Sequence, residues 1–148
     1  MTKENKAISN LLNHISALGS KEITLLIPIF FFLIDEKILA YKIFLGLIII
    51  YSIGIIIRLT YNKERPKHKP RNNILQKIDA NSFPSMHSSR STFLLIILIQ
   101  YFEYQIKIIA FFYIIYITIL YARIHKKRHD FIDLVGGIFL GILPFFFI

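Results

Sequence analysis

The 148-residue sequence contains no cysteine and few charged residues. Without cysteine, the fold can hold neither disulfide bonds nor metal sites built from thiolates. Only 18% of the residues are charged, whereas 55% are hydrophobic and the mean hydropathy is +0.56. This composition is too apolar for an ordinary soluble domain of this length, and it indicates a membrane protein.

Acidic residues are scarcer than basic ones, with 9 Asp and Glu against 18 Lys and Arg, and the formal net charge is +9 at pH 7. In a soluble protein this excess would favour nucleic acid as a partner. In a membrane protein, anionic lipid headgroups and phosphorylated substrates are equally good partners. The charge alone does not choose between these classes.

Five apolar stretches follow an amphipathic segment at residues 5–18, where apolar side chains recur at helical spacing and predict an interfacial helix. The segment lacks the continuous apolar run and cleavage site of a signal peptide, so we expect it to be retained. The apolar stretches are residues 23–34, 38–57, 91–102, 108–122 and 131–148. The sequence therefore predicts an all-α integral-membrane bundle of about five transmembrane helices plus this amino-terminal helix. We expect a single domain over residues 1–148, without repeats.

Several apolar stretches are shorter than the ~20 residues that a helix needs to cross a hydrocarbon core of about 30 Å, so they must extend into their flanks. If all five cross, residues 58–90 and 123–133 share one side of the membrane with the amino terminus. Nearly all the unusual polar chemistry then converges on one face. In the last stretch, Gly137 and Gly141 would let another helix approach closely, although glycine is also common in membrane helices in general.

The stretch ARIHKKRHDFID, residues 122–133, is polar between two apolar flanks. His125, His129 and Asp133 recur every four residues, so on a helix they would form one stripe that could hold a zinc ion. The alternative is a basic loop that holds its helix at the membrane surface by snorkelling. This segment alone leaves both interpretations open.

Two further polar stretches are expected on the same side, RLTYNKERP at residues 58–66 and FPSMHSSR at residues 83–90. Arginine supplies a planar fork of donors that suits phosphate oxygens, and Ser85 with neighbouring N–H groups could add more. His87 precedes an apolar stretch, where a histidine can hand a proton to a leaving group. Taken singly, each residue is better explained as an interface anchor, a helix-start signal or a surface residue.

Together, the three blocks resemble the type-2 phosphatidic acid phosphatase superfamily, integral-membrane lipid phosphatases related in their site to the vanadium haloperoxidases. That family carries KxxxxxxRP, then PSGH, then SRxxxxxHxxxD. In this chain all three spacings hold, in the same order. The matching residues are Arg58, Arg65 and Pro66, then Pro84, Ser85, Met86 and His87, and finally Ala122, Arg123, His129 and Asp133.

The resemblance implies a phosphatase that needs no metal ion or other cofactor. His129 would attack phosphorus and form a phosphohistidine, while Asp133, expected one helical turn away, would hold the other ring nitrogen. His87 would protonate the departing oxygen and then activate the hydrolytic water. The residues expected to bind the phosphate oxygens are Arg58, Arg65, Ser85 and Arg123.

Three motif positions depart from the family pattern. Arg58 replaces lysine, which keeps the charge but changes the donor geometry. Met86 replaces glycine and lacks its conformational freedom, which bears on any backbone N–H contact to phosphate. Ala122 replaces serine, and we expect a minor loss of hydrogen bonding. The five crossings that we expect are also one fewer than the six usual in the family.

We therefore expect a membrane phosphatase acting on a lipid phosphate or diphosphate, surrounded by membrane lipids and without a nucleic-acid partner. Undecaprenyl pyrophosphate, phosphatidylglycerophosphate, phosphatidic acid and lipid A phosphate all suit such a site. Two alternatives come from other classes. One is a non-catalytic small membrane protein that binds anionic lipid, and the other is a zinc-dependent membrane hydrolase using His125, His129 and Asp133.

The loop charges and the family resemblance favour opposite orientations in the membrane. Lys67, Lys69, Lys126 and Lys127 are not needed by the motifs, and by the positive-inside rule they favour a cytoplasmic location of the polar side. Bacterial members of the family usually direct this side outward. We expect a multi-pass protein of the bacterial inner membrane whose active site faces the periplasm or the exterior.

Overall fold

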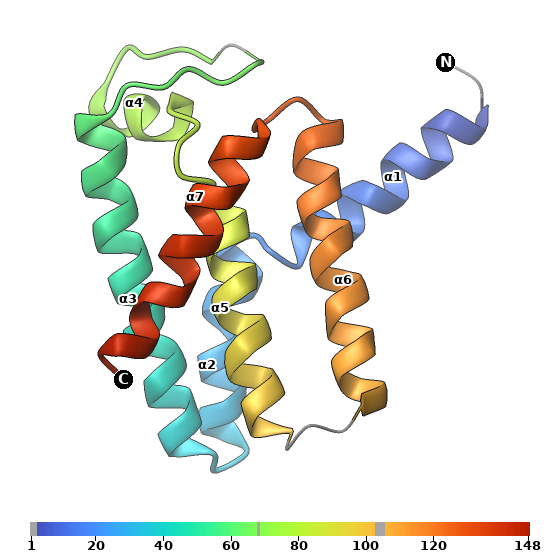
Figure 1. Cartoon of the computed structure of the whole chain (residues 1–148), viewed down its shortest axis with the longest axis vertical. Helices are drawn as coiled ribbons and strands as arrows, with labels where there is room; N and C mark the ends of the chain where they lie inside the picture. The colour runs from blue at the N-terminus through green and yellow to red at the C-terminus, as the bar shows by residue number, and fades with distance from the viewer. Residues whose placement is uncertain (1–2, 68, 103–105) are drawn as a thin grey trace.

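The computed structural model describes residues 3–67, 69–102 and 106–148, with side chains from residue 10 onward. These residues form a bundle of helices joined by short connections and one long polar loop (Figure 1). The helices are α1 (Lys3–Ala17), α2 (Lys21–Leu33), α3 (Lys37–Thr60), α4 (Ile74–Ala80), α5 (Met86–Tyr101), α6 (Ile106–His125), α7 (Phe131–Ile142) and the 3₁₀ helix η1 (Leu143–Phe146). The six predicted helices are all present, so the all-α prediction is confirmed.

The structure differs from the prediction at the start of α5 and at α4, and in both places a polar side chain caps the helix. The Ser85 side chain accepts a hydrogen bond from the backbone N–H of Ser88, so α5 begins five residues before its apolar stretch and includes His87. The short helix α4 was not predicted. It starts after Asn73, whose side chain accepts a hydrogen bond of 2.8 Å from the backbone N–H of Gln76.

Judged by length and composition, fewer helices could cross a membrane than the five that the sequence predicts. Within the described residues, α3 (24 residues) and α6 (20 residues) are long and apolar enough to cross a membrane. The pair α1 and α2, bent by 44°, passes the same test together. The helix α5 is shorter, with 16 residues and a polar first turn. Five crossings therefore remain a prediction. In the predicted amphipathic stripe, the side chains of residues 7 and 8 lie outside the part of the chain whose side chains are described.

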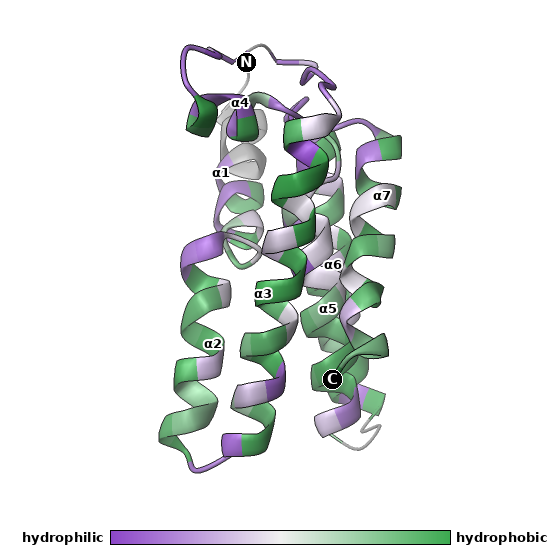
Figure 2. Ribbon diagram, turned by 90° about the vertical axis from the view of Figure 1, so that its left-hand side faces the viewer, coloured by the Kyte–Doolittle hydropathy of each residue, from purple (hydrophilic) through white to green (hydrophobic). Residues whose placement is uncertain are grey.

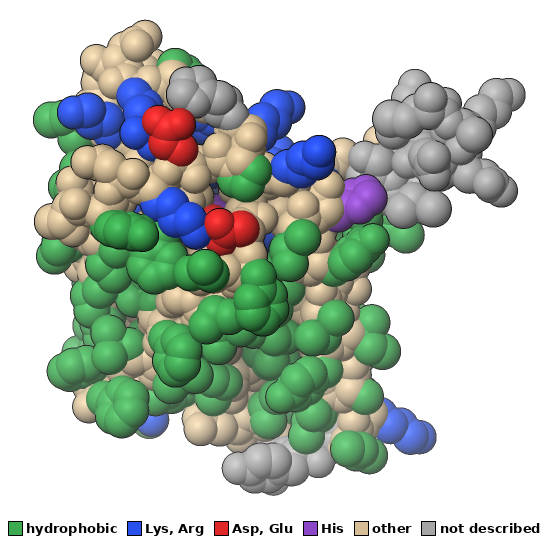
Figure 3. Space-filling view, turned by 45° about the horizontal axis from the view of Figure 1, so that its top comes forward, with side chains coloured by type: hydrophobic (Ala, Val, Ile, Leu, Met, Phe, Trp, Pro, Cys, Tyr) green, Lys and Arg blue, Asp and Glu red, His purple; other side chains and the backbone are tan. Residues whose placement is uncertain are grey.

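Polar residues gather at one end of the bundle, where α4 and the long loop lie beside the α6–α7 connection (Figure 2). In the space-filling view, Lys and Arg side chains lie together at this end, above a surface that is mostly hydrophobic (Figure 3). We call it the polar end. The two polar regions that were predicted to share one side of the membrane do lie at the same end of the bundle.

The closest helix pair is α5 and α7. A Cβ added to Gly137 would lie 2.5 Å from the backbone oxygen of Ser85, and one added to Gly141 would meet the backbone oxygen of Ser89. Only glycine lets the two backbones approach this far. The expectation that Gly137 and Gly141 admit another helix is thus confirmed. Further hydrogen bonds join the starts of the two helices: the Ser85 N–H donates to the Asp133 carbonyl at 2.9 Å, and the Ser88 hydroxyl donates to that of Leu134 at 2.9 Å.

Candidate active site

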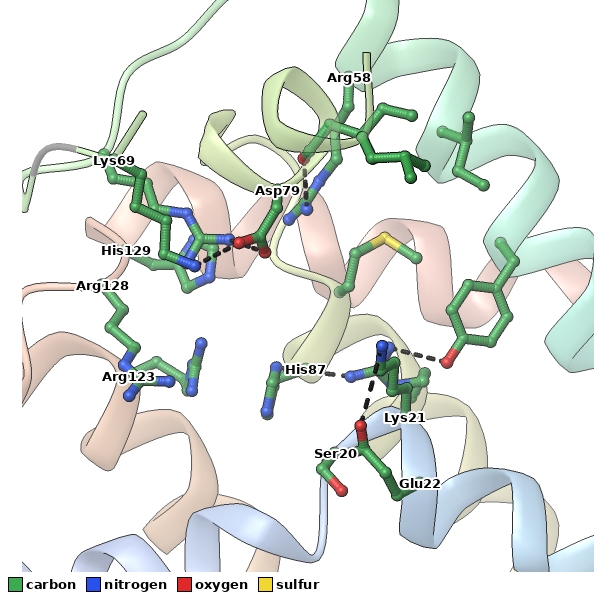
Figure 4. A pocket seen from close by; sticks show the side chains of 17 residues that line it. Ser20, Lys21, Glu22, Arg58, Lys69, Asp79, His87, Arg123, Arg128 and His129 are labelled. Atoms are coloured by element: carbon green, nitrogen blue, oxygen red, sulfur yellow. Dashed lines mark hydrogen bonds and ion pairs between the residues drawn. The ribbon is translucent and has the colours of Figure 1, made fainter. Parts of the chain in front are cut away.

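A pocket of about 450 Å³ lies at the polar end, between α3, α5, α6 and the start of α2. Figure 4 shows His87 on one side of this pocket and Arg123 and Arg128 across from it. Five of the seven predicted site residues line it: Arg58, Arg65, His87, Arg123 and His129. The other two, Ser85 and Asp133, are fully buried behind its wall.

His87 enters the pocket from the first turn of α5, directly after Met86. Met86 is the first helical residue, so the position that is glycine in the family motif needs no special backbone conformation here. The Met86 side chain fits against a glycine of α3, because a Cβ added to Gly54 would lie 2.5 Å from the Met86 sulfur. A glycine on α3 therefore makes room for the larger side chain at this motif position.

The predicted helical stripe of His125, His129 and Asp133 is wrong. Helix α6 ends at His125, and Lys127 takes a left-handed conformation with φ 52°. The next helix starts after Asp130, whose side chain forms a capping box with Asp133. His129 lies in the connection between the two helices. Since a cap and a left-handed residue interrupt the helix, His129 and Asp133 are not separated by one helical turn.

The zinc-site alternative loses its basis for the same reason. His125 stacks on Tyr121, with ring centroids 5.6 Å apart, rather than turning toward His129. Within the part of the chain that the structure describes, no three His, Cys, Asp or Glu side chains come close enough to hold a metal ion together.

His129 and Asp133 nevertheless face one another inside the protein. The Nδ1 atom of His129 lies 3.4 Å from the nearer carboxylate oxygen of Asp133, an ion-pair distance whose alignment falls short of a hydrogen bond. The pKa of His129 is lowered to about 4, chiefly by burial and also by the charges of Arg65 and Arg123, while Asp133 acts in the opposite direction. At neutral pH the ring is uncharged, which is the form that can act as a nucleophile.

Asp133 is held by three other groups. Lys63 Nζ donates to its Oδ1 at 2.8 Å, and the hydroxyl of Ser82 donates to the same oxygen at 3.3 Å. The backbone N–H of Asp130 donates to Oδ2 at 3.2 Å. Lys63 also contacts the Asp130 carboxylate at 2.7 Å, and although burial alone would lower the pKa of Lys63, these two carboxylates raise it. Lys63 therefore stays charged and fixes the carboxylate behind His129.

Arg65 and Arg123 present unpaired donors in the wall of the pocket. The Arg65 side chain is 7% exposed and that of Arg123 is buried, yet the Nε of each has no hydrogen-bond partner among the described residues. Buried N–H groups without partners are uncommon, and guanidinium groups bind phosphate oxygens well. Each of these two guanidinium groups therefore keeps a donor that no described residue uses.

Arg58 lines the pocket and uses three of its five N–H donors on backbone carbonyls. Its Nε and Nη2 donate to the carbonyl of Pro84 at 3.3 and 2.8 Å, and its Nη1 donates to the carbonyl of Ile78 at 3.0 Å. Arg58 thus ties the end of α3 to the loop that leads into α5. The Ser85 side chain likewise has a structural contact, because its oxygen caps α5 by accepting from the Ser88 N–H.

Asp79 on α4 is an acidic residue at the pocket that the motifs did not indicate. Its carboxylate pairs with Arg65 at 3.6 Å and with Lys69. Burial by itself raises the pKa of Asp79, but the hydrogen bond from Lys69 and the charge of Arg65 hold it below its usual value. An anionic ligand would compete with this carboxylate for Arg65.

Comparisons with known proteins agree with this geometry. Among solved structures, LpxE of Aquifex aeolicus superposes with a TM-score of 0.72 at 21% sequence identity, covering 95% of this chain and 87% of that one, which shows a shared fold. A comparison with curated proteins found no match. The sequence profile of the PAP2 superfamily matches residues 24–148, a range that contains all three motif blocks. The chain therefore belongs to the PAP2 superfamily and is a phosphatase of that superfamily.

Proposed function

We propose that this protein is a membrane phosphatase that hydrolyses a lipid phosphate or diphosphate through a phosphohistidine at His129. The observation that carries the proposal is the surroundings of His129, a neutral buried ring backed by Asp133 and next to the unpaired donors of Arg65 and Arg123. His87 lines the same pocket. The pocket lies at the polar end of an apolar bundle, the level at which the phosphate of a membrane lipid would lie.

The contacts give each group a role in this mechanism. Since Nδ1 of His129 faces Asp133, the other ring nitrogen, Nε2, would attack phosphorus as the bond to the lipid oxygen breaks. His87 would give a proton to that oxygen and, in the second step, take one from the water that attacks the phosphohistidine. Arg65 and Arg123 would stabilise the charge on the equatorial oxygens.

Arg58, Ser85 and Lys63 have supporting roles in the same proposal. Arg58 holds the loop before α5, and Ser85 caps the helix that carries His87. Lys63 holds Asp133. The phosphate-binding contribution expected of Arg58 and Ser85 would then come chiefly from fixing this framework. We propose no metal ion in the reaction, since the guanidinium groups can supply the positive charge.

The decisive experiment is phosphate release by the purified protein from undecaprenyl pyrophosphate, phosphatidylglycerophosphate, phosphatidic acid and lipid A phosphate, with and without excess chelator. We expect turnover of at least one lipid in the presence of chelator. His129→Gln should abolish it, whereas His87→Gln should slow it and let phosphohistidine accumulate. The matched control is Lys77→Gln, an exposed residue of α4. Substantial activity of the His129 variant, or activity that chelator removes and zinc restores, would refute the mechanism.

We further propose that the polar end faces the periplasm or the cell exterior. The chain has no native cysteine, so a single cysteine reports its own location without interference. Asn72, an exposed loop residue beside α4, is a suitable position. In intact cells, Asn72→Cys should react with a membrane-impermeant thiol reagent. Labelling only after the inner membrane is breached would show the opposite orientation.

A further inference from the structure

Arg90 is a buried arginine at the end of the stretch FPSMHSSR, and it matches none of the family's motif positions. It lies on α5 three residues after His87, is 4% exposed and lines the same pocket. An arginine so deeply buried must place its five donors on acceptors or on a ligand.

Two other parts of the chain hold the Arg90 guanidinium in place. Its Nε and Nη2 donate to the backbone carbonyl of Gly19 at 3.3 and 2.8 Å, at the break between α1 and α2. Its Nη1 donates to the hydroxyl of Tyr51 on α3 at 3.0 Å, and the guanidinium carbon lies 5.4 Å from the centre of that ring. The group is thus fixed by contacts that do not involve the catalytic residues.

The remaining contact of Arg90 is with His87. Nη2 lies 3.4 Å from Nδ1 of the imidazole, and a guanidinium can only donate a hydrogen bond. Nδ1 must therefore be the acceptor in this pair and carry no proton. In a neutral imidazole the proton then resides on Nε2, on the opposite edge of the ring.

We propose that Arg90 is a positioning residue that sets the tautomer of His87, keeping Nδ1 unprotonated and the proton on Nε2. Its consequence rests on the proposed function: in the resting enzyme the entering phosphate ester meets a hydrogen-bond donor at its bridging oxygen, and His87 can give a proton to that oxygen only after it has taken up a second proton from solvent at Nδ1. The carbonyl of Gly19 holds Arg90 in turn, so the break between α1 and α2 contributes to the geometry of His87.

A purely structural role for Arg90 would be to tie α5 to Gly19 and Tyr51. Two variants separate the roles. Tyr51→Phe removes one tie and leaves the contact with His87, whereas Arg90→Met removes the tie and the contact together. Only the proposed role predicts that these variants differ at His87.

The test is a ¹H–¹⁵N spectrum of the full-length protein labelled at its histidine nitrogens, in detergent micelles at a pH where His87 is neutral. Protonated and unprotonated ring nitrogens have well-separated shifts, and the His87 signals are identified by their loss in His87→Gln. We expect the wild type to carry the His87 proton on Nε2. In Arg90→Met, the ratio of the two tautomers should move by about tenfold toward Nδ1–H, the effect of losing one hydrogen bond. Tyr51→Phe should keep the wild-type ratio.

A proton on Nδ1 of His87 in the wild type would overturn the proposal, and this measurement does not depend on the folding of any variant. An unchanged ratio in folded Arg90→Met, or an equal change in Tyr51→Phe, would also overturn it. The spectrum is independent of turnover. A protein with the expected tautomer but no phosphatase activity would refute the proposed function alone, and an active enzyme with the other tautomer would refute this inference alone.

Discussion

Lys63 Nζ lies 2.8 Å from Oδ1 of Asp133, a residue 70 positions away in the sequence. The contact joins the loop after α3 to the carboxylate behind His129. Asp133 is fully buried, and a buried charge without a partner is costly. Lys63 therefore links the first motif block to the third, through a side chain that neither motif includes.

Replacing Lys63 by methionine should weaken both stability and activity. Asp133 would keep Ser82 and the Asp130 N–H as partners, so we expect a loss of about 1–3 kcal/mol in the free energy of unfolding rather than complete unfolding. Phosphate release should fall at least tenfold, because the carboxylate behind His129 is less well held. Lys77→Met is the control. Unfolding in detergent and kcat/KM measure the two effects, and unchanged values for both would contradict the role assigned to Lys63.

Replacing Arg58 by lysine would restore the residue usual in the family, and we expect it to be harmful here. A single ammonium group cannot reproduce the fork that reaches both Pro84 and Ile78. The free energy of unfolding should fall by about 1–2 kcal/mol, and KM should rise as the loop before α5 loosens. Thermal unfolding and steady-state kinetics test this. A variant as stable and active as the wild type would mean that Arg58 acts only through its charge.

The buried neutral His129 should make the protein sensitive to acid. Its pKa is lowered from 6.5 to about 4, so the unfolded chain takes up this proton near pH 6.5 and the folded one only near pH 4. As the pH falls through that window, protonation favours the unfolded chain, and stability is lost by roughly 3 kcal/mol. His129→Gln removes this contribution. Unfolding measured between pH 7 and pH 4 should show a steeper loss in the wild type than in the variant, and equal slopes would exclude the effect.

Met86 and Gly54 should be energetically coupled. In the wild type, Gly54→Ala places a methyl group against the Met86 sulfur, so any gain in helix propensity is offset. In the Met86→Gly background the obstacle is gone, and the same substitution should stabilise the protein by about 0.5–1 kcal/mol. A double-mutant cycle measured by unfolding tests the coupling. Additive effects would show that the two side chains do not compete for this space.

Adding a methyl group at Gly137 should separate α5 from α7. The new Cβ would meet the Ser85 carbonyl, which belongs to the backbone and cannot rotate away. We expect Gly137→Ala to cost about 1–3 kcal/mol and to reduce phosphate release at least tenfold, because His87 and Asp133 lie on the two helices that are forced apart. Phe139→Ala, on the exposed face of α7, should leave turnover close to the wild-type rate. Equal activity of the two variants would contradict this account of the packing.

Much of the helix arrangement could be predicted from the sequence, because long apolar stretches mark the helices and their alternation places the polar segments. The motif spacings then indicated Arg65, His87, Arg123 and His129, which do line one pocket. The boundaries near the site were harder. Capping at Ser85 lengthened α5, and the cap at Asp130 broke the helix expected through His129.

The remaining contacts depend on side chains that meet only in the folded chain. Arg90 meets Gly19 and Tyr51 across 71 and 39 residues, and no local pattern distinguishes it from other basic residues. The direction of the Arg58 guanidinium, toward carbonyls rather than open space, is likewise invisible in a motif. Asp79 sits on a helix of seven residues, too short for hydrophobic periodicity to reveal.

The backbone contact between α5 and α7 restricts how a lipid could reach the pocket sideways from its own leaflet. A hydrocarbon tail passes between two helices when large side chains at their seam rotate out of its path. At Gly137 and Gly141 there is no side chain to rotate, because main chain already touches main chain. A lipid would therefore enter between other pairs of helices, whose facing side chains can move. The same two glycines that bring the two halves of the active site together therefore exclude lipid entry from the bilayer between α5 and α7.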